Sequence, residues 1–191
     1  MNNFYAVKKM LTGKIAMLIA LFFLLCGIGN SYAANYYWVN GTGNWSDFAN
    51  HWATTSGGAI FHVSVPAQGD DVFFDANSFP LPLGVVTLDV ASICRNMNWT
   101  GATNNPNFAG NSSLNIYGSI IFIPGMTATY NGMLTFSATG AGNIIDFSTV
   151  VLNINNFQFN GSGEWTLNSD IDCSLLPFSM FTILQGTLNT Y

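Results

Sequence analysis

Residues 114–136 read LNIYGSIIFIPGMTATYNGMLTF, and this stretch decides the fold of the chain. It holds short runs, apolar or alternating, that are separated by glycine or by Pro–Gly: 114–117, 120–123, 127–130 and 133–136. Such runs between turn residues are typical of β-strands, because successive side chains of a strand point to opposite faces. Similar runs lie at 85–90, 150–154, 157–159, 165–167 and 181–184, and no convincing amphipathic helix follows Tyr36. We therefore predict an all-β chain.

A loose repeat accompanies the predicted strands. An apolar or aromatic residue lies one or two positions before a glycine, at intervals that average about 21 residues, close to one coil of a β-solenoid. These glycines are Gly101, Gly118, Gly132, Gly161 and Gly186. Asparagine is frequent, tolerates left-handed backbone angles at turns, and can form hydrogen-bonded ladders between stacked coils. The repeat favours a parallel β-helix, although a β-sandwich also has many short strands joined by turns.

The composition limits the class of protein. The chain has 191 residues, which suits one domain, and its 49% hydrophobic and 15% aromatic content argues against disorder. Only 7% of residues are charged, and a total of 4 Lys and Arg with a pI near 4.4 argues against nucleic-acid binding. The one continuous apolar segment, 15–28, has about 14 residues, whereas a membrane-spanning helix needs roughly 20.

The first 33 residues have the pattern of a secretory signal peptide. Three lysines precede or flank the apolar segment, and a small–x–small site at 31–33 follows it, so we predict cleavage after Ala33. An uncleaved membrane anchor is the alternative. Cleavage leaves Arg95 as the single Lys or Arg, with a net charge of about −8 and no membrane span. The mature chain would be secreted or held at the outer cell surface, where Cys94 and Cys173 are free to pair, although we expect two buried thiols.

The segment 37–52, YWVNGTGNWSDFANHW, is the most distinctive motif. Trp38, Trp45 and Trp52 are evenly spaced in it, and PAQGDDVFFD follows at 66–75. Together with NMNWTG at 96–101, these motifs resemble the N-terminal region of large secreted surface proteins of the Bacteroidetes type, and more loosely the start of autotransporter-like β-helix passengers. The resemblance covers residues 36–118. It implies a right-handed parallel β-helix, export, and an adhesin-like role at the cell surface.

The residues of these motifs suggest structural roles and, as alternatives, binding roles. The three tryptophans can form an aromatic cap over the open end of the first coil, or a platform for sugar rings if they are exposed. Asp70, Asp71 and Asp75 form the densest acidic cluster. Three acids can begin a calcium site but cannot supply its six to eight oxygen ligands, so we expect hydrogen bonds in turns and in the cap instead.

Candidate catalytic residues are sparse. His51 and His62 are the only histidines, and no zinc-ligand spacing accompanies them, so we expect both to be structural. Asp170 and Asp172 flank Ile171 and share one face of a predicted strand, where we expect solvent to reach them. A polysaccharide lyase or hydrolase needs a carboxylate pair, or a cluster of acids with a basic residue, along one face, and a single arginine leaves almost no candidate for a lyase-like basic catalyst. We therefore predict no enzymatic activity and no cofactor.

These observations give one integrated prediction. Residues 1–33 are the signal peptide, 34–80 the N-terminal cap region, and 81–191 the β-helix coils, apparently truncated because the strand pattern continues to Tyr191. The protein would be a non-catalytic structural or adhesin-like molecule, the N-terminal portion of a longer β-helical protein. Its partners would be surface glycans or components of host or neighbouring cells. The alternative is a carbohydrate-binding or carbohydrate-active β-helix.

Overall fold

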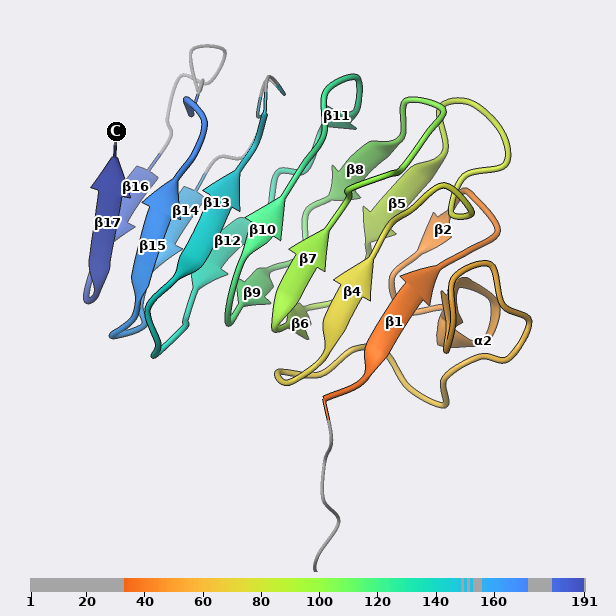
Figure 1. Ribbon diagram of the computed structural model, residues 1–191, viewed down its shortest axis with the longest axis horizontal. Coiled ribbons are helices and arrows are strands. Elements are labelled where there is room, and N and C mark those ends of the chain that lie inside the picture. Colours follow the sequence, from red (N-terminus) through yellow and green to blue (C-terminus); the bar gives the residue numbers. More distant parts are fainter. Residues whose placement is uncertain (1–32, 149, 151, 153–155, 172–179, 191) are drawn as a thin grey trace, which may run out of the picture. The chain divides into compact units, whose positions relative to one another are not determined.

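The computed structural model describes residues 33–148, 150, 152, 156–171 and 180–190. The described chain is nearly all β and forms a β-solenoid of about five turns, with about 3% helix (Figure 1). The predicted signal peptide, except for Ala33, and Cys173 lie outside the described residues. Within the described residues, no helix is both long and apolar enough to cross a membrane.

Within the described residues, the strands form three sheets, one along each side of the solenoid. Sheet A has the spatial order β17 (Thr187–Thr190), β15 (Glu164–Leu167), β13 (Asn143–Asp146), β10 (Ile120–Ile121), β7 (Asn96–Asn98), β4 (Asp71–Phe73), β1 (Asn35–Trp38) and β3 (Trp52–Ala53). Sheet B has the order β11 (Thr127–Ala128), β8 (Asn107–Gly110), β5 (Val85–Leu88) and β2 (Gly43–Asn44). Sheet C has the order β16 (Met180–Ile183), β14 (Asn156–Phe159), β12 (Met133–Phe136), β9 (Leu114–Ile116) and β6 (Ser92–Cys94).

Neighbouring strands from successive coils pair in parallel, which confirms the predicted solenoid. In sheet A, Val72 pairs with Met97, Met97 with Ile120, and Ile120 with Ile145. From β4 onward, paired residues lie about 20 to 25 positions apart in the sequence, within the range of one structural repeat. A sandwich of antiparallel sheets would pair strands joined by short turns, so the parallel register rules out that alternative.

The core is a column of apolar side chains inside the three sheets. Alternate residues of each strand point inward, and Val72, Met97, Ile120 and Ile145 are all fully buried. Aromatic rings fill the wider parts of the interior, where the ring of Trp99 stacks on Phe74 with a centroid distance of 3.8 Å. Burying apolar area contributes about 25 cal/mol per Å², so this column supplies the main favourable term for folding.

Asparagine and glycine form the turns between the sheets. Asn40, Asn104 and Asn105 have φ angles of 65°, 67° and 50°, which confirms the predicted use of asparagine in left-handed turns. Gly110, with φ of 113°, lies against the backbone of Leu88 on the neighbouring coil, and a Cβ at this position would overlap the Leu88 carbonyl oxygen. Glycine is required here both for the backbone angle and for the close approach of two coils.

The N-terminal end combines parallel and antiparallel pairing. β1 pairs in parallel with β4 on one side and antiparallel with β3 on the other, and the helix α2 (Phe48–His51) precedes β3. β2 also pairs in parallel with β5. The sheets therefore begin at Asn35, earlier than the predicted start of the coils at residue 81, because the alternating NYYW segment is itself a strand.

The last described coil is less covered than the coil before it. Phe157 and Phe159 on β14 are only 2% and 1% exposed. Their register partners on β16, Phe181 and Ile183, occupy the same interior columns but are 48% and 49% exposed. The interior of the solenoid is thus open at β16, whereas Trp38 in the first coil is fully buried.

Candidate functional site

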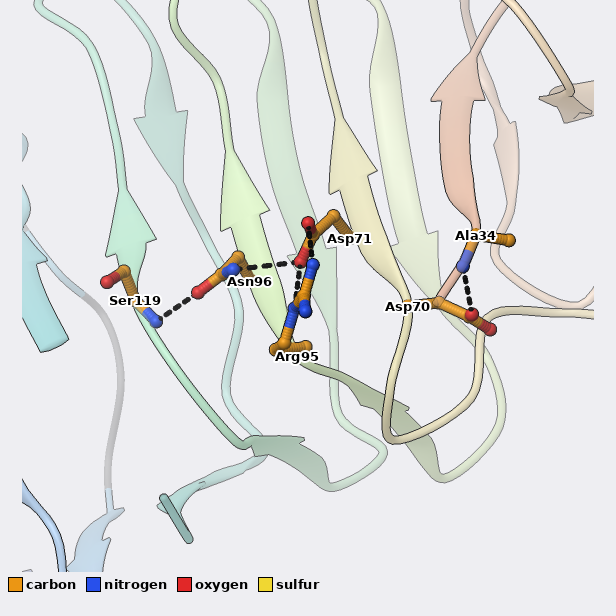
Figure 2. Close-up of polar contacts among 6 residues, drawn as sticks. All are labelled: Ala34, Asp70, Asp71, Arg95, Asn96 and Ser119. Atoms are coloured by element: carbon orange, nitrogen blue, oxygen red, sulfur yellow. Dashed lines mark hydrogen bonds and ion pairs between the residues drawn. The ribbon is translucent and has the colours of Figure 1, made fainter. Parts of the chain in front are cut away.

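A connected group of charged and polar side chains lies on sheet A, where β4, β7 and β10 begin (Figure 2). The Asp71 carboxylate accepts a hydrogen bond from Arg95 Nε at 2.7 Å and forms an ion pair with Arg95 Nη2. The same carboxylate accepts a third bond from Asn96 Nδ2 at 2.8 Å. Asp71 belongs to one coil, and Arg95 and Asn96 lie at the start of the next, so these contacts join two coils.

Side-chain bonds then continue from coil to coil. The Ser119 backbone N–H donates to Asn96 Oδ1 at 2.7 Å, and the Ile144 backbone N–H donates to Ser119 Oγ at 2.9 Å. We name Asp71, Asn96 and Ser119 the polar ladder. It crosses four successive coils, since Asp71, Asn96, Ser119 and Ile144 each belong to a different coil. The predicted ladders are therefore present, but they are built from unlike side chains rather than from a repeated asparagine.

The ion pair between Arg95 and the ladder residue Asp71 is partly accessible to solvent, on the arginine side. The Arg95 side chain is 44% exposed and that of Asp71 14%, and the hydrogen bond that Arg95 donates to Asp71 raises the pKa of the guanidinium. An exposed pair contributes about 0–1 kcal/mol, because water screens it and two side chains must be held in place. Beside it, Cys94 is fully buried, and burial together with the Asp71 and Asp70 charges raises the pKa of this thiol. The ladder therefore aligns coils and does not activate a nucleophile.

The three predicted acidic residues have separate partners. Asp70 accepts from the backbone N–H groups of Ala34 and Ala67, both at 2.8 Å, and so ties the first strand to the loop before β4. Asp75 accepts from Asn77 N–H at 2.9 Å within a turn. Among the described residues, no group of three or more His, Cys, Asp or Glu side chains is arranged to hold a metal ion. The structure does not bring the three acids together as a calcium site, because turn amides and a guanidinium occupy their oxygens.

The three predicted tryptophans are fully buried. The rings of Trp38 and Trp52 meet edge to face at 4.9 Å, and those of Trp45 and Trp52 at 4.7 Å. Trp38 Nε1 donates to the Gly41 carbonyl at 2.7 Å, and Trp52 Nε1 donates to the Trp45 carbonyl at 2.9 Å. A sugar platform needs exposed ring faces, so the alternative role of these residues in carbohydrate binding is wrong in this structure.

Both histidines stack on buried aromatic rings. His51 lies on Trp38 at a centroid distance of 4.5 Å, and its Nδ1 is 2.8 Å from the Val39 carbonyl oxygen. His62 lies on Tyr36 at 3.6 Å, and its Nε2 is 3.0 Å from the Asn35 carbonyl oxygen. These contacts agree with the predicted structural role. Asp170 lies beside an open cavity of about 430 Å³ with Asn168 and Ser169, and Asp172 is outside the described residues.

Two surface features were not predicted from the sequence. Tyr37 and Phe73, both half-buried, stack on the outer face of sheet A with a centroid distance of 5.1 Å. The loop between β4 and β5 exposes Leu81 and Leu83, at 73% and 71%, and Leu81 lines a cavity of about 330 Å³. The alternating segment 71–75 could have indicated an outward-facing aromatic residue at Phe73, and the Pro-Leu-Pro-Leu segment at 80–83 could have indicated apolar side chains in a loop.

Comparison with known proteins gives no further guidance: no family model, curated protein or solved structure matches the chain.

Proposed function

We propose that this chain is an exported structural or adhesin-like protein of the cell surface, without catalytic activity, and that it is the N-terminal portion of a longer β-helical protein. The observation that carries the proposal is the polar ladder on a regular solenoid. The Asp71 carboxylate is bonded to both Arg95 and Asn96 of the next coil, so these charged and polar side chains join coils to each other. Such an arrangement supports a rigid, extended surface for display.

The burial of side chains in the first and the last described coils supports two further parts of the proposal, the aromatic cap and the longer solenoid. At the N-terminal end, Tyr36 and Trp38 are 5% and 0% exposed, which supports an aromatic cap formed with Trp45 and Trp52. In the last described coil, Phe181 and Ile183 are half exposed at interior positions. A further coil would cover them as β16 covers β14, which supports a longer solenoid. An open coil otherwise leaves unpaired strand edges that favour aggregation.

Export is tested by the start of the mature chain and its location. The full chain is produced with a C-terminal tag in a Gram-negative host, and the extracellular, envelope and cytosolic fractions are analysed by intact mass. The expected product begins at Ala34 and is found outside the cytosol. Ala33→Leu should block cleavage, because signal peptidase requires a small residue there, and Ala34→Leu is the matched control. A full-length product in the cytosol would contradict the proposal.

Adhesion is tested with the same mature product. Beads coated with the chain should bind intact cells, and excess soluble chain should compete with them. Beads coated with heat-unfolded chain are the control for non-specific adsorption. Binding that is equal for folded and unfolded chain would refute an adhesin-like role.

Carbohydrate binding is the second candidate function, and one observation favours it. The Tyr37–Phe73 stack is partly accessible and lies next to Asn98, which is the register partner of Phe73. Aromatic rings beside amide and carboxylate groups suit sugar rings and hydroxyls. A glycan array probed with the wild-type chain and with Phe73→Ala tests this candidate. Signals that Phe73→Ala removes would support it, and signals that are absent or unchanged would reject it.

A further inference from the structure

The loop between β4 and β5 exposes apolar side chains that make little contact with the rest of the protein. Leu81 and Leu83 are 73% and 71% exposed, and each follows a proline in the segment 80–83. No charged residue occurs in the sequence between Asp75 and Asp89. Exposed apolar groups without charges nearby are typical of interaction sites.

The backbone of this loop is held in an unfavourable conformation. Leu83 has φ of 62°, in the left-handed region that a bulky side chain rarely adopts. Its N–H donates to the Asn104 carbonyl at 2.8 Å, and Asn104 Nδ2 donates to the Phe79 carbonyl at 2.7 Å. Phe79 itself is fully buried. Glycine would fit this backbone angle without strain, and the exposed leucine side chain gains little packing within the chain, so folding gives no reason for leucine at this position.

A cavity adjoins the loop at Leu81 and at Gly84, the residue after Leu83. Its volume is about 330 Å³, and its lining combines residues 40–42 with Pro80, Leu81, Pro82 and Gly84 of the loop. Water occupies about 30 Å³ per molecule in the liquid, so the cavity has ample room for the four carbon atoms of a leucine side chain. One patch therefore offers both projecting side chains and a recess that can receive them.

We propose that the loop 79–84 is a self-association site, through which two copies of this chain pair with two-fold symmetry. Leu81 and Leu83 of one copy occupy the cavity of the other, and the reverse contact is made at the same time. A patch that carries both parts of its own contact is the requirement for such a symmetric interface. Its lack of charge also matters, because two copies of an acidic chain repel each other elsewhere.

This inference rests on the proposed surface role and names its partner as a second copy, on the same or a neighbouring cell. The patch is small, so a single contact is weak. Many copies on two opposed surfaces would bind together far more strongly than one pair, because each contact raises the effective concentration for the next.

Sedimentation equilibrium of the purified chain, at concentrations up to about 1 mM, tests the proposal. The wild type should show a reversible monomer–dimer equilibrium. Leu81→Ser and Leu83→Gly should each weaken it by about tenfold or more, since each substitution acts twice in a symmetric dimer. Leu83→Gly should also keep or raise the melting temperature, because glycine relieves the backbone angle, so its loss of association cannot come from unfolding.

Two control variants distinguish this site from other apolar surfaces. Val63→Ser removes a 90% exposed side chain from another loop, and Leu184→Ser removes a 58% exposed one from the last described coil. Both should leave the dimer unchanged. A monomer at every concentration, or a dimer weakened by Leu184→Ser and not by Leu83→Gly, would overturn the proposal. A chain that is exported and adhesive but monomeric would refute self-association alone, whereas retention in the cytosol would refute the proposed function.

Discussion

Removing the asparagine of the polar ladder should destabilise the solenoid more than removing its neighbour on the same strand. Asn96→Ala deletes the bond from Nδ2 to the Asp71 carboxylate at 2.8 Å and leaves the Ser119 N–H without its acceptor at 2.7 Å. A hydrogen bond to a charged group contributes about 1.5–3 kcal/mol, and an unsatisfied, half-buried N–H adds about 1 kcal/mol. The free energy of unfolding should therefore fall by about 2.5–4 kcal/mol.

Asn98→Ala is the matched control for this prediction. Asn98 lies two residues further along β7 on the same face, and its Oδ1 accepts only a local bond from Thr100 N–H at 2.8 Å. Its loss should cost about 0.5–1 kcal/mol, because no other coil depends on it. The two variants thus remove the same side chain from the same strand and differ in whether a contact between coils is lost.

Urea unfolding measures the difference. With a slope of about 2 kcal/mol per M, Asn96→Ala should lower the midpoint by about 1.3–2 M, and Asn98→Ala by about 0.5 M or less. Amide hydrogen exchange at Ser119 gives a local check, since its N–H loses protection only in Asn96→Ala. If the two variants have equal midpoints, or if Ser119 keeps its protection, the ladder does not stabilise the stack and the reasoning fails.

Three further predictions follow from the packing. Gly118→Ala should be destabilising by about 1–3 kcal/mol, because the added Cβ would overlap the Asn96 side chain of the ladder. A Cβ at Gly140 meets nothing within 4 Å, so Gly140→Ala should be neutral, and thermal unfolding of both variants checks the difference. Trp99→Ala should lower the free energy of unfolding by about 3–5 kcal/mol, and Trp99→Phe by clearly less. The buried Trp99 Nε1 has no partner among the described residues, so replacing the indole by a phenyl ring costs no hydrogen bond. Equal urea midpoints of the two variants would refute this difference. Burial raises the pKa of Cys94 and Tyr130 above their ordinary values of 9.0 and 10.0. Both groups therefore lose their protons more easily in the unfolded chain than in the folded one, and their contribution to stability is complete below pH 9.0 and falls as the pH rises above these values. The melting temperature should accordingly fall above pH 9, and the Cys94→Ala, Tyr130→Phe double variant should fall less steeply.

The strands could be predicted from the sequence because their signal is local. Alternation within residues 133–136 and 157–159 identifies β12 and β14, and each strand buries the predicted alternate residues. Glycine spacing was a weaker guide. Gly101 and Gly186 have positive φ, whereas at Gly118, Gly132 and Gly161, and also at Gly186, a side chain would overlap a neighbouring coil. The repeat is therefore set by the register of the coils and not by one turn type.

The candidate site was harder to predict because its contacts depend on register. Asp71 meets Asn96, and Asn96 meets Ser119, because the strand register places them at the same position of successive coils, and no local pattern fixes the length of each coil. The tryptophans were expected to be buried in a cap, and the structure buries them. Leu83 could not be placed in advance, since a left-handed angle would be expected at glycine or asparagine.

Distances between spin labels test the central claim, that the outer positions of sheet A stack once per coil. Asn35, Asp71, Asn96, Ser119, Ile144, Thr166 and Asn189 form one column in register. With strands about 4.8 Å apart, labels at Asn35 and Ile144 should lie about 19 Å apart, and labels at Asn35 and Asn189 about 29 Å apart. Pulsed electron–electron double resonance is measured on a chain whose native cysteines are replaced. The distance between the labels should be about 10 Å longer for the second pair than for the first. Equal distances, or a shorter distance for the second pair, would contradict a stack of parallel coils.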